Sequence, residues 1–281
     1  MSAAKKPTAA AVEPLPGLAP WHGGKRHLAR RLAALLDADR HTCFVDVFAG
    51  MGGVFFGRAK RRKVEIINDA NGDLVTLYRV TQRHLPALLE AIAAMPAART
   101  EFDRLLDIRA CDLTDVERAA RLLFLQRMKW AGDQRKRHFL SNRQTAKVLT
   151  EEAWRRRLTR ARDRLVGVTI EHLDFEACIR RFAGPETVFY LDPPYWGFET
   201  IYGKGIFARS DFARLATVLR QTRSRFLFSI NDVPEIRDMF GGWARLGEVQ
   251  TIYTAHDGGR KDVTELLIAG GPRPMVNDGP L

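Results

Sequence analysis

The chain has 281 residues, of which 46% are hydrophobic, and a formal net charge of +12 at pH 7. This length and hydrophobic content are those of a globular protein with a full core, and the basic charge indicates a polyanionic partner such as nucleic acid or a membrane surface. Cys43, Cys111 and Cys178 have no paired spacing, which argues against a zinc site or a disulfide framework and favours a reducing cytoplasm. No apolar run reaches the roughly 18 residues of a membrane span, and no signal peptide is recognisable.

The amino-terminal region starts with an Ala/Pro-rich stretch, and residues 1–18 are expected to form a flexible tail. The first structured segment is Pro20-Trp21-His22-Gly23-Gly24-Lys25, followed by an amphipathic helix with leucines at positions 28, 32, 35 and 36. A Gly-Gly loop that enters a helix beside a lysine suits a negatively charged group. It does not match a nucleoside-triphosphate loop, because Ala19 and Arg26 stand where that motif has Gly and Ser or Thr. Trp21 fits core packing and a ligand-facing place equally well.

A strand over residues 43–48 leads into Ala49-Gly50-Met51-Gly52-Gly53 and then a helix, a shape that lets the backbone approach a cofactor closely. The strict dinucleotide fingerprint is broken, because Phe55 stands in place of its third glycine. A second strand over residues 64–68 ends at Asp69, nineteen residues after Gly50, where an acidic residue commonly binds ribose hydroxyls. Asp69 alone could be a helix cap, but with the glycine turn it predicts a nucleoside cofactor.

Residues 71–95 are expected to be helical, and residues 96–165 then interrupt the alternation of strands and helices with a charged, helix-rich insertion. Between Arg118 and Arg164 there are fifteen Lys and Arg against four Asp and Glu, nearly the whole charge excess of the chain. A charge run is usually a solvated face, but here aromatic residues are interleaved with it. We predict a DNA-contacting insertion whose phosphate contacts are Arg127, Lys129, Arg135, Lys136, Arg137, Arg155, Arg156 and Arg157.

After the insertion the alternation resumes, and Val188-Phe189-Tyr190-Leu191 reads as a strand covered on both faces. Pro193 and Pro194 cannot continue a ladder, so Asp192 lies at the carboxyl end of that strand, the edge where ligands bind in open α/β sheets. A carboxylate and a carbonyl there can accept both N–H bonds of an amino group on a flat heterocycle, while an aromatic ring stacks on its face. An ordinary strand exit with a capping Asp is the alternative, and the complete Asp-Pro-Pro-Tyr set favours the functional interpretation.

The carboxyl-terminal part begins with a loop over residues 197–207, which could close over a base or be a plain connection. Ser210-Asp211 is expected to cap a helix, and residues 226–230 form the next buried strand. Two final strands, near residues 249–253 and 263–269, flank a basic turn and predict an antiparallel edge on a parallel sheet. Residues 271–281 are expected to be a second tail.

Taken in order, these motifs resemble the Dam-like, alpha-group DNA adenine-N6 methyltransferases, which use S-adenosylmethionine. The resemblance covers residues 21–269 and is carried by Trp21-His22-Gly23-Gly24-Lys25, Asp46-Val47-Phe48-Ala49-Gly50-Met51-Gly52, Asn68-Asp69-Ala70-Asn71, Asp192-Pro193-Pro194-Tyr195, Ser229-Ile230-Asn231-Asp232 and Glu265-Leu266-Leu267-Ile268. The chain departs from the GATC-specific members, because the recognition-hairpin pattern is absent from the insertion. The target sequence is therefore left unassigned.

The resemblance implies a Rossmann-like α/β methyltransferase fold with a catalytic domain over residues 19–95 and 166–270 and a recognition insertion over residues 96–165. Asp192 and the Pro193 carbonyl would hold the adenine amino group, Tyr195 would stack on the flipped ring, and no metal is expected. Cofactor-binding residues would be Trp21, Lys25, Asp46, Phe48, Gly50, Gly52, Asp69 and Asp192, and the catalytic set Asp192, Pro193, Pro194 and Tyr195.

The expected activity is site-specific methylation of adenine N6 in double-stranded DNA, with a cognate restriction endonuclease as a candidate partner. A cytoplasmic monomer without membrane association is favoured. The alternatives are methylation of RNA or of another amino group, and a DNA-binding relative that has lost catalysis.

Overall fold

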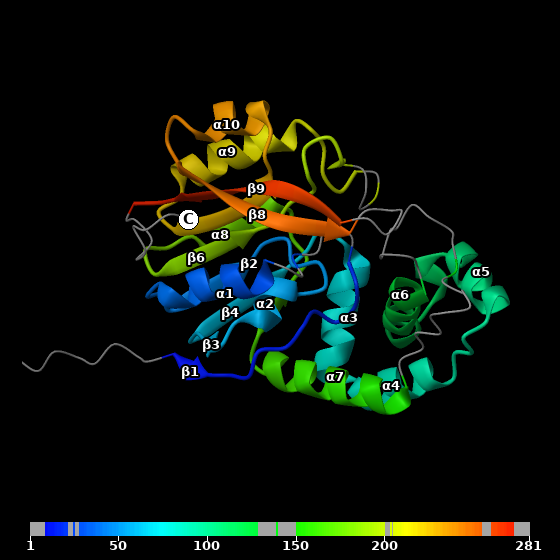
Figure 1. Cartoon of the computed structure of the whole chain (residues 1–281). Coiled ribbons are helices and arrows are strands. Elements are labelled where there is room, and N and C mark those ends of the chain that lie inside the picture. Colours follow the sequence, from blue (N-terminus) through cyan, green and yellow to red (C-terminus); the bar gives the residue numbers. More distant parts are fainter. Residues whose placement is uncertain are drawn as a thin grey trace, which may run out of the picture.

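The computed structural model describes residues 9–21, 25, 28–128, 139, 150–199, 203, 205–254 and 260–272, and it centres on a seven-stranded sheet (Figure 1). The strand order is β5-β4-β2-β6-β7-β9-β8. The bounds are β2 Cys43–Asp46, β4 Val64–Asn68, β5 Thr169–Glu171, β6 Thr187–Leu191, β7 Arg225–Asn231, β8 Arg245–Thr254 and β9 Arg260–Gly270. All pairs from β5 to β7 are parallel, and β9 is antiparallel to β7 and β8. The predicted Rossmann-like sheet with an antiparallel edge is confirmed.

Helices cover both faces of this sheet. One face packs against α1 Ala29–Ala38, α2 Gly53–Gly57, α3 Gly72–Arg83 and α7 Glu151–Leu165, and the other against α8 Phe175–Phe182, α9 Asp211–Gln221 and α10 Pro234–Phe240. Local signals explain several starts: the side chains of Asn71, Thr150 and Asp174 accept the first free N–H groups of α3, α7 and α8. Ser210 makes no such bond at α9, where Asp211 accepts from the Ala208 N–H instead.

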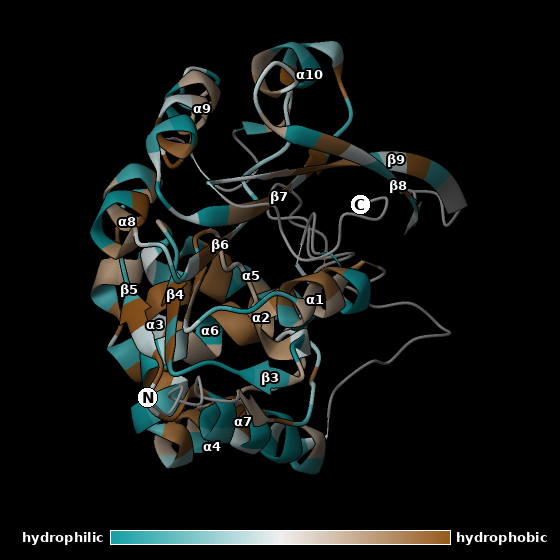
Figure 2. Cartoon of the chain, turned by 90° about the vertical axis from the view of Figure 1, so that its left-hand side faces the viewer, coloured by the Kyte–Doolittle hydropathy of each residue, from teal (hydrophilic) through white to brown (hydrophobic). Residues whose placement is uncertain are grey.

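Strand β6 is buried along its whole length, as predicted. Val188 and Tyr190 belong to the core on one face of the sheet, and Phe189 and Leu191 to the core on the other. The alternation follows from the two-residue period of a strand, and it explains why this run has no polar face. Figure 2 shows the hydrophobic residues in the central strands and hydrophilic residues on the outer sides of the helices.

A group of helices lies at one side of the sheet (Figure 1). It comprises α4 Leu85–Ala93, α5 Arg99–Asp107, the short 3₁₀ helix Ala110–Asp112 and α6 Asp115–Met128. Helices α6 and α7 pack on α3 and α4. Trp154 and Leu158 of α7 belong to the same hydrophobic core as the sheet. A smaller core joins α5 to α6 through Phe102, Leu105 and Phe124. Within the described residues no helix is long and apolar enough to cross a membrane.

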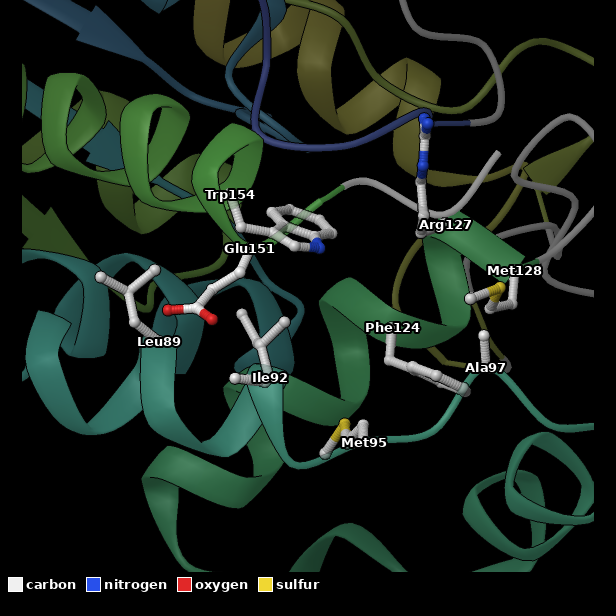
Figure 3. Close-up of a pocket in the computed structure, with 10 residues that line it drawn as sticks. Leu89, Ile92, Met95, Ala97, Phe124, Arg127, Met128, Glu151 and Trp154 are labelled. Carbon is white, nitrogen blue, oxygen red and sulfur yellow. The ribbon is translucent and has the colours of Figure 1, made fainter. Parts of the chain in front are cut away.

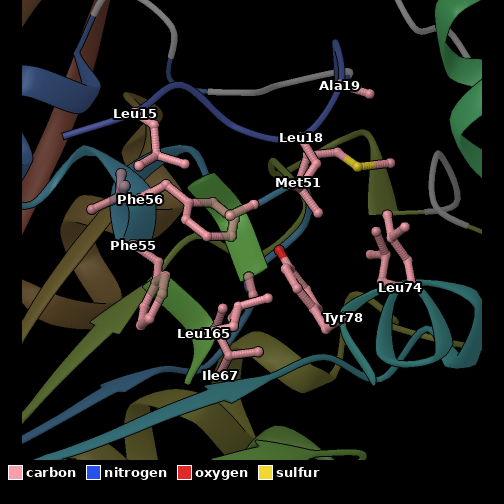
Figure 4. Packing of buried hydrophobic residues seen from close by; sticks show 14 of the residues in the cluster. Leu15, Leu18, Ala19, Met51, Phe55, Phe56, Ile67, Leu74, Tyr78 and Leu165 are labelled. Atoms are coloured by element: carbon pink, nitrogen blue, oxygen red, sulfur yellow. The ribbon is translucent and has the colours of Figure 1, made fainter. Parts of the chain in front are cut away.

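Residues 9–18 are not a tail, which corrects the expectation for that part of residues 1–18. Strand β1 Ala10–Ala11 pairs with β3 Lys60–Arg61, and Leu15 and Leu18 are buried against Phe56 and Met51 (Figure 4). The Leu18 N–H donates to the Met51 carbonyl at 2.9 Å. Alanine and proline content suggested disorder, but the two leucines bury enough apolar surface to fix the segment.

A group of buried ion pairs lies near the amino end of β4. Glu65 accepts from Arg58 Nη1 at 2.9 Å and from both terminal nitrogens of Arg164, at 2.5 and 3.0 Å. Arg58 also donates to Asp37 at 3.1 Å. Arg164 is the end of α7, so this group ties α7 to the sheet. It also shows that one positive charge counted in the basic insertion is buried and paired.

Replacing Glu65 by Gln is expected to lower the free energy of unfolding by about 3 kcal/mol, because Arg164 then loses its paired carboxylate and Arg58 keeps only Asp37. Urea unfolding of the purified protein measures the loss. Glu90→Gln on the exposed face of α4 is the matched control and should change stability by less than about 0.5 kcal/mol. A loss at Glu65 as small as that of the control would show that the ion pairs contribute little.

Candidate active site

The register of three parallel strands brings the predicted site residues together at the carboxyl ends of these strands, which form one edge of the sheet. Asp46 of β2 is level with Ile67 of β4 and with Tyr190 of β6. Phe48, Asp69 and Asp192 each follow two residues later, so they leave the sheet at the same level. The order of the strands reverses between β2 and β6, and ligands of open α/β sheets bind at such a reversal.

The glycine turn after β2 owes its composition to side chains that pack on it. Gly50 and Gly52 have φ angles of 53° and 75°, which favour glycine. A Cβ on Gly50 would lie 3.0 Å from the indole nitrogen of Trp21, and one on Gly52 would lie 2.6 Å from the ring of Phe56. The Tyr78 hydroxyl donates to the Gly50 carbonyl at 2.8 Å. Trp21, placed in sequence far from this turn, therefore lies directly against it.

Asp69 connects the glycine turn to the start of α3. It accepts from the Gly50 N–H at 2.9 Å and from the Asn71 N–H at 2.8 Å. The side chain that caps α3 is Asn71, which accepts from the Asp73 N–H. The cap that the sequence allowed for Asp69 is therefore made by Asn71, and Asp69 fixes the turn. Burial raises the pKa of Asp69 to about 6.

Asp46 is the most deeply buried carboxyl of this edge. Burial first, and then the nearby Asp192 and Asp69, raise its pKa well above its ordinary value. Its Oδ1 atom has no hydrogen-bond partner among the described residues. Phe48 lies beside it in an aromatic group, with its ring 5.9 Å from that of Phe175 and 5.8 Å from that of Phe207. The carboxyl ends of these strands therefore combine a carboxyl oxygen that has no donor among the described residues with apolar rings.

Asp192 is held by a lysine from the amino-terminal motif. Lys25 Nζ contacts Asp192 Oδ1 and donates to the Tyr195 hydroxyl at 3.1 Å. The Lys25 side chain is 1% exposed, whereas that of Asp192 is 19% exposed. Burial raises the pKa of Asp192 to about 6, against the opposing effects of Lys25 and of a hydrogen bond with Ser229. Lys25, predicted as a cofactor residue, thus contacts the predicted catalytic loop.

Two residues to which the sequence assigned no role hold the rest of the loop. The Tyr195 hydroxyl donates to Glu265 Oε1 at 2.5 Å. Asn231, at the end of β7, accepts from the Trp196 N–H at 2.9 Å and donates to the Trp196 carbonyl at 3.2 Å. Pro193 and Pro194, which are part of this loop, are buried. The sequence signal that could have identified Glu265 is its position as a single glutamate in the otherwise apolar run of residues 265–268.

The predicted DNA contacts divide into described and undescribed residues. Arg155 and Arg156 are exposed on α7, and Arg157 is partly buried and donates to the Leu18 carbonyl at 3.4 Å. Arg127 is partly buried at the end of α6. Lys129, Arg135, Lys136 and Arg137 lie outside the described residues, as do His22, Gly23 and Gly24 of the amino-terminal motif.

A cavity of about 120 Å³ lies between α4, α6 and α7, away from Asp192 (Figure 3). Its lining is mainly apolar and includes Leu89, Ile92, Phe124 and Trp154. It shares no residue with the edge that carries Asp46, Asp69 and Asp192. The interleaved aromatic residues of the insertion are thus partly explained by packing.

The chain is similar in sequence to two Type II methyltransferases. The chain is 25% identical over 273 residues to Type II methyltransferase M1.LlaDCHI of Lactococcus lactis subsp. cremoris, covering 88% of this chain and 93% of that protein. It is 22% identical over 235 residues to Type II methyltransferase M.CviBI of Paramecium bursaria Chlorella virus NC1A, covering 79% and 85%. A solved precorrin 8W decarboxylase of Methanobacterium thermoautotrophicum overlaps it with a TM-score of only 0.34 at 12% identity, over 87% of this chain and 89% of that one.

The sequence model of one family matches residues 21–255, the span that contains the glycine turn, Asp69 and the Asp192 loop. A match over this much of the chain assigns the family directly. The protein therefore belongs to the D12 class N6 adenine-specific DNA methyltransferases and is a site-specific DNA adenine methyltransferase.

Proposed function

We propose that the edge formed by β4, β2 and β6 binds S-adenosylmethionine beside an adenine held by Asp192, Pro193 and Tyr195. The observation that carries the proposal is the shared level of Asp69, the glycine turn and Asp192 at the reversal of strand order. The shared level supports a site in which the nucleoside-binding residues lie next to the amino-group acceptor.

The described residues fit this cofactor because they offer carboxylates to a positively charged ligand. Asp46 and Asp69 both have raised pKa values, and Asp46 Oδ1 has no hydrogen-bond partner among the described residues. A cationic ligand with hydroxyl and ammonium donors would stabilise both carboxylates. Trp21, against Gly50, adds an aromatic surface that suits a heterocycle or a sulfonium cation. When bound, S-adenosylmethionine supplies a methyl group on a positively charged sulfur.

The chain's own residues then prepare the amino group of the base. Asp192 and the Pro193 carbonyl accept its two N–H bonds, which localises the nitrogen lone pair and aims it at the methyl carbon. The carboxylate also stabilises the positive charge that develops on nitrogen until one N–H proton passes to solvent. Tyr195 provides the ring on which the extrahelical adenine stacks. The role of these residues is to orient the base and exclude water.

The partners follow from the substrate and from the relatives. We propose that α7 faces the DNA backbone through Arg155 and Arg156, with Arg127 and Arg157 nearby. Two relatives named Type II methyltransferases support a link to a restriction endonuclease, and a cytoplasmic monomer acting on double-stranded DNA suits this role.

Asp192→Ala is expected to lower methyl transfer by at least about 10²-fold, because the amino group loses its charged acceptor. Tritiated S-adenosylmethionine and unmethylated genomic DNA measure transfer, and DNA binding is measured in parallel. Asp238→Asn, on the exposed side of α10, is the control and should behave as wild type. Transfer to RNA alone, or cofactor binding without any transfer by the wild type, would contradict the proposed function.

The rate of methyl transfer at saturating cofactor is expected to fall as the pH drops below about 6. Asp192 has a pKa raised to about 6, so its carboxylate is present above that value and protonated below it. Asp69 has a similar pKa, and its protonation should weaken cofactor binding instead. Single-turnover rates and cofactor titrations at each pH separate the two effects. A single-turnover rate that stays constant down to pH 5 would exclude the carboxylate role of Asp192.

The double substitution Arg155→Gln and Arg156→Gln is expected to weaken DNA binding and to flatten its dependence on salt, by about 0.9 in logarithmic slope per lost phosphate contact. Cofactor affinity should not change. Arg180→Gln and Arg181→Gln on α8 remove the same charge from the other face of the sheet and serve as the control. Equal salt-dependence slopes for the two double variants would show that Arg155 and Arg156 of α7 do not contact the DNA backbone.

A further inference from the structure

Glu265 is a fully buried carboxylate in the middle of β9. Its side chain is 0% exposed, and the residues that follow it, Leu266, Leu267 and Ile268, are buried and apolar. In the antiparallel register it is level with Asn231, the residue that holds Trp196. Burying a carboxylate in such a strand is unfavourable unless specific partners offset the loss of water. The partners of Glu265 therefore indicate its purpose.

Two contacts of this carboxylate lead into the methyl-transfer site. Oε1 accepts from the Tyr195 hydroxyl at 2.5 Å, and Oε2 lies 3.9 Å from Lys25 Nζ. Lys25 in turn contacts Asp192 and lies 4.6 Å from the centre of the Tyr195 ring. One lysine is thus shared by two carboxylates, and only that of Asp192 is partly exposed.

We propose that Glu265 is a positioning residue for methyl transfer, which fixes the Tyr195 ring through its hydroxyl and shares Lys25 with Asp192. This inference rests on the proposed function, in which Asp192 accepts the adenine amino group and Tyr195 stacks on the base. Holding the hydroxyl removes the freedom of the ring to rotate about its side-chain bonds, so the stacking surface exists before the base arrives. Sharing the lysine leaves negative charge on Asp192 for the amino group.

The charges of Lys25, Asp192 and Glu265 predict a measurable effect that distinguishes this role. Lys25, Asp192 and Glu265 together carry one net negative charge, and Glu265→Gln makes the group neutral. Lys25 is then committed to Asp192, which becomes a weaker acceptor for the amino group. Glu265 also raises the pKa of Asp192, so its removal should lower that pKa. Asp46 is a further carboxyl neighbour of Asp192, and it stays in place.

Glu265→Gln is expected to lower the single-turnover rate of methyl transfer about 10- to 100-fold and to move the acid limb of its pH profile to lower pH. Affinities for S-adenosylmethionine and for DNA should stay near those of the wild type. Asp262→Asn, an exposed position on the same strand, is the matched control and should leave the rate and the acid limb unchanged. An unmoved acid limb in Glu265→Gln, with or without a lower rate, would overturn the shared-lysine role.

Tyr195→Phe tests the other contact without touching the buried charge, and it decides the case if Glu265→Gln does not fold. It keeps the ring but removes the hydroxyl, and transfer should fall about tenfold because the ring is no longer fixed. In the double variant the two effects should be clearly less than multiplicative, since both remove one contact. A wild-type rate in Tyr195→Phe, or fully multiplicative effects, would overturn the positioning role.

The two proposals fail in different ways. If the wild type transfers no methyl group to any DNA, the proposed function is wrong. If the wild type is active and Glu265→Gln is equally active with the same pH profile, only the role of Glu265 is wrong.

Discussion

The position of β2 between β4 and β6 is the constraint on which the site depends. Two parallel pairings fix the level of three strand ends, and these ends carry the glycine turn, Asp69 and Asp192. A shift of one residue in either pairing would turn the alternating side chains of a strand to the opposite face and exchange its contributions to the two cores. Because both faces are covered by helices, the hydrophobic packing of β6 enforces the register that the chemistry needs.

Among the described residues, carboxyl groups outnumber positive charges in the site. Asp46, Asp69 and Asp192 all have raised pKa values, with burial as the main cause. Lys25 is the cation that contacts one of them. Such an edge is suited to a cationic cofactor and to an amino group that becomes positively charged, because each brings what the carboxylates lack. In the sequence, the basic charge of the chain lies mainly elsewhere, between Arg118 and Arg164.

Much of this arrangement could be predicted from local patterns. The apolar run before Asp192, the glycine turn and the strand before Asp69 carry signals within a few residues, and the structure bears out those strands and that turn. The contact of Glu265 with Tyr195 spans 70 residues, and no local period encodes such a contact. The burial of three residues could not be predicted for the same reason. Leu15 and Leu18 lie in an Ala/Pro-rich stretch that is typical of a disordered tail. Arg164 lies in a basic run that is typical of a solvated surface, and its pairing with Glu65 of β4 depends on the fold.

The buried ion pairs of Arg58, Glu65 and Arg164 hold α7 in a fixed position relative to β4. Glu65 lies near one end of β4, and Asp69 follows the other end, so the strand and the helix form one stiff connection between the exposed arginines of α7 and the strand ends that carry Asp69 and Asp192. A duplex that rests on Arg155 and Arg156 would meet the catalytic loop at a set distance. Changes of target sequence during evolution would therefore arise in segments other than α7, whose tilt cannot alter without unpairing buried charges.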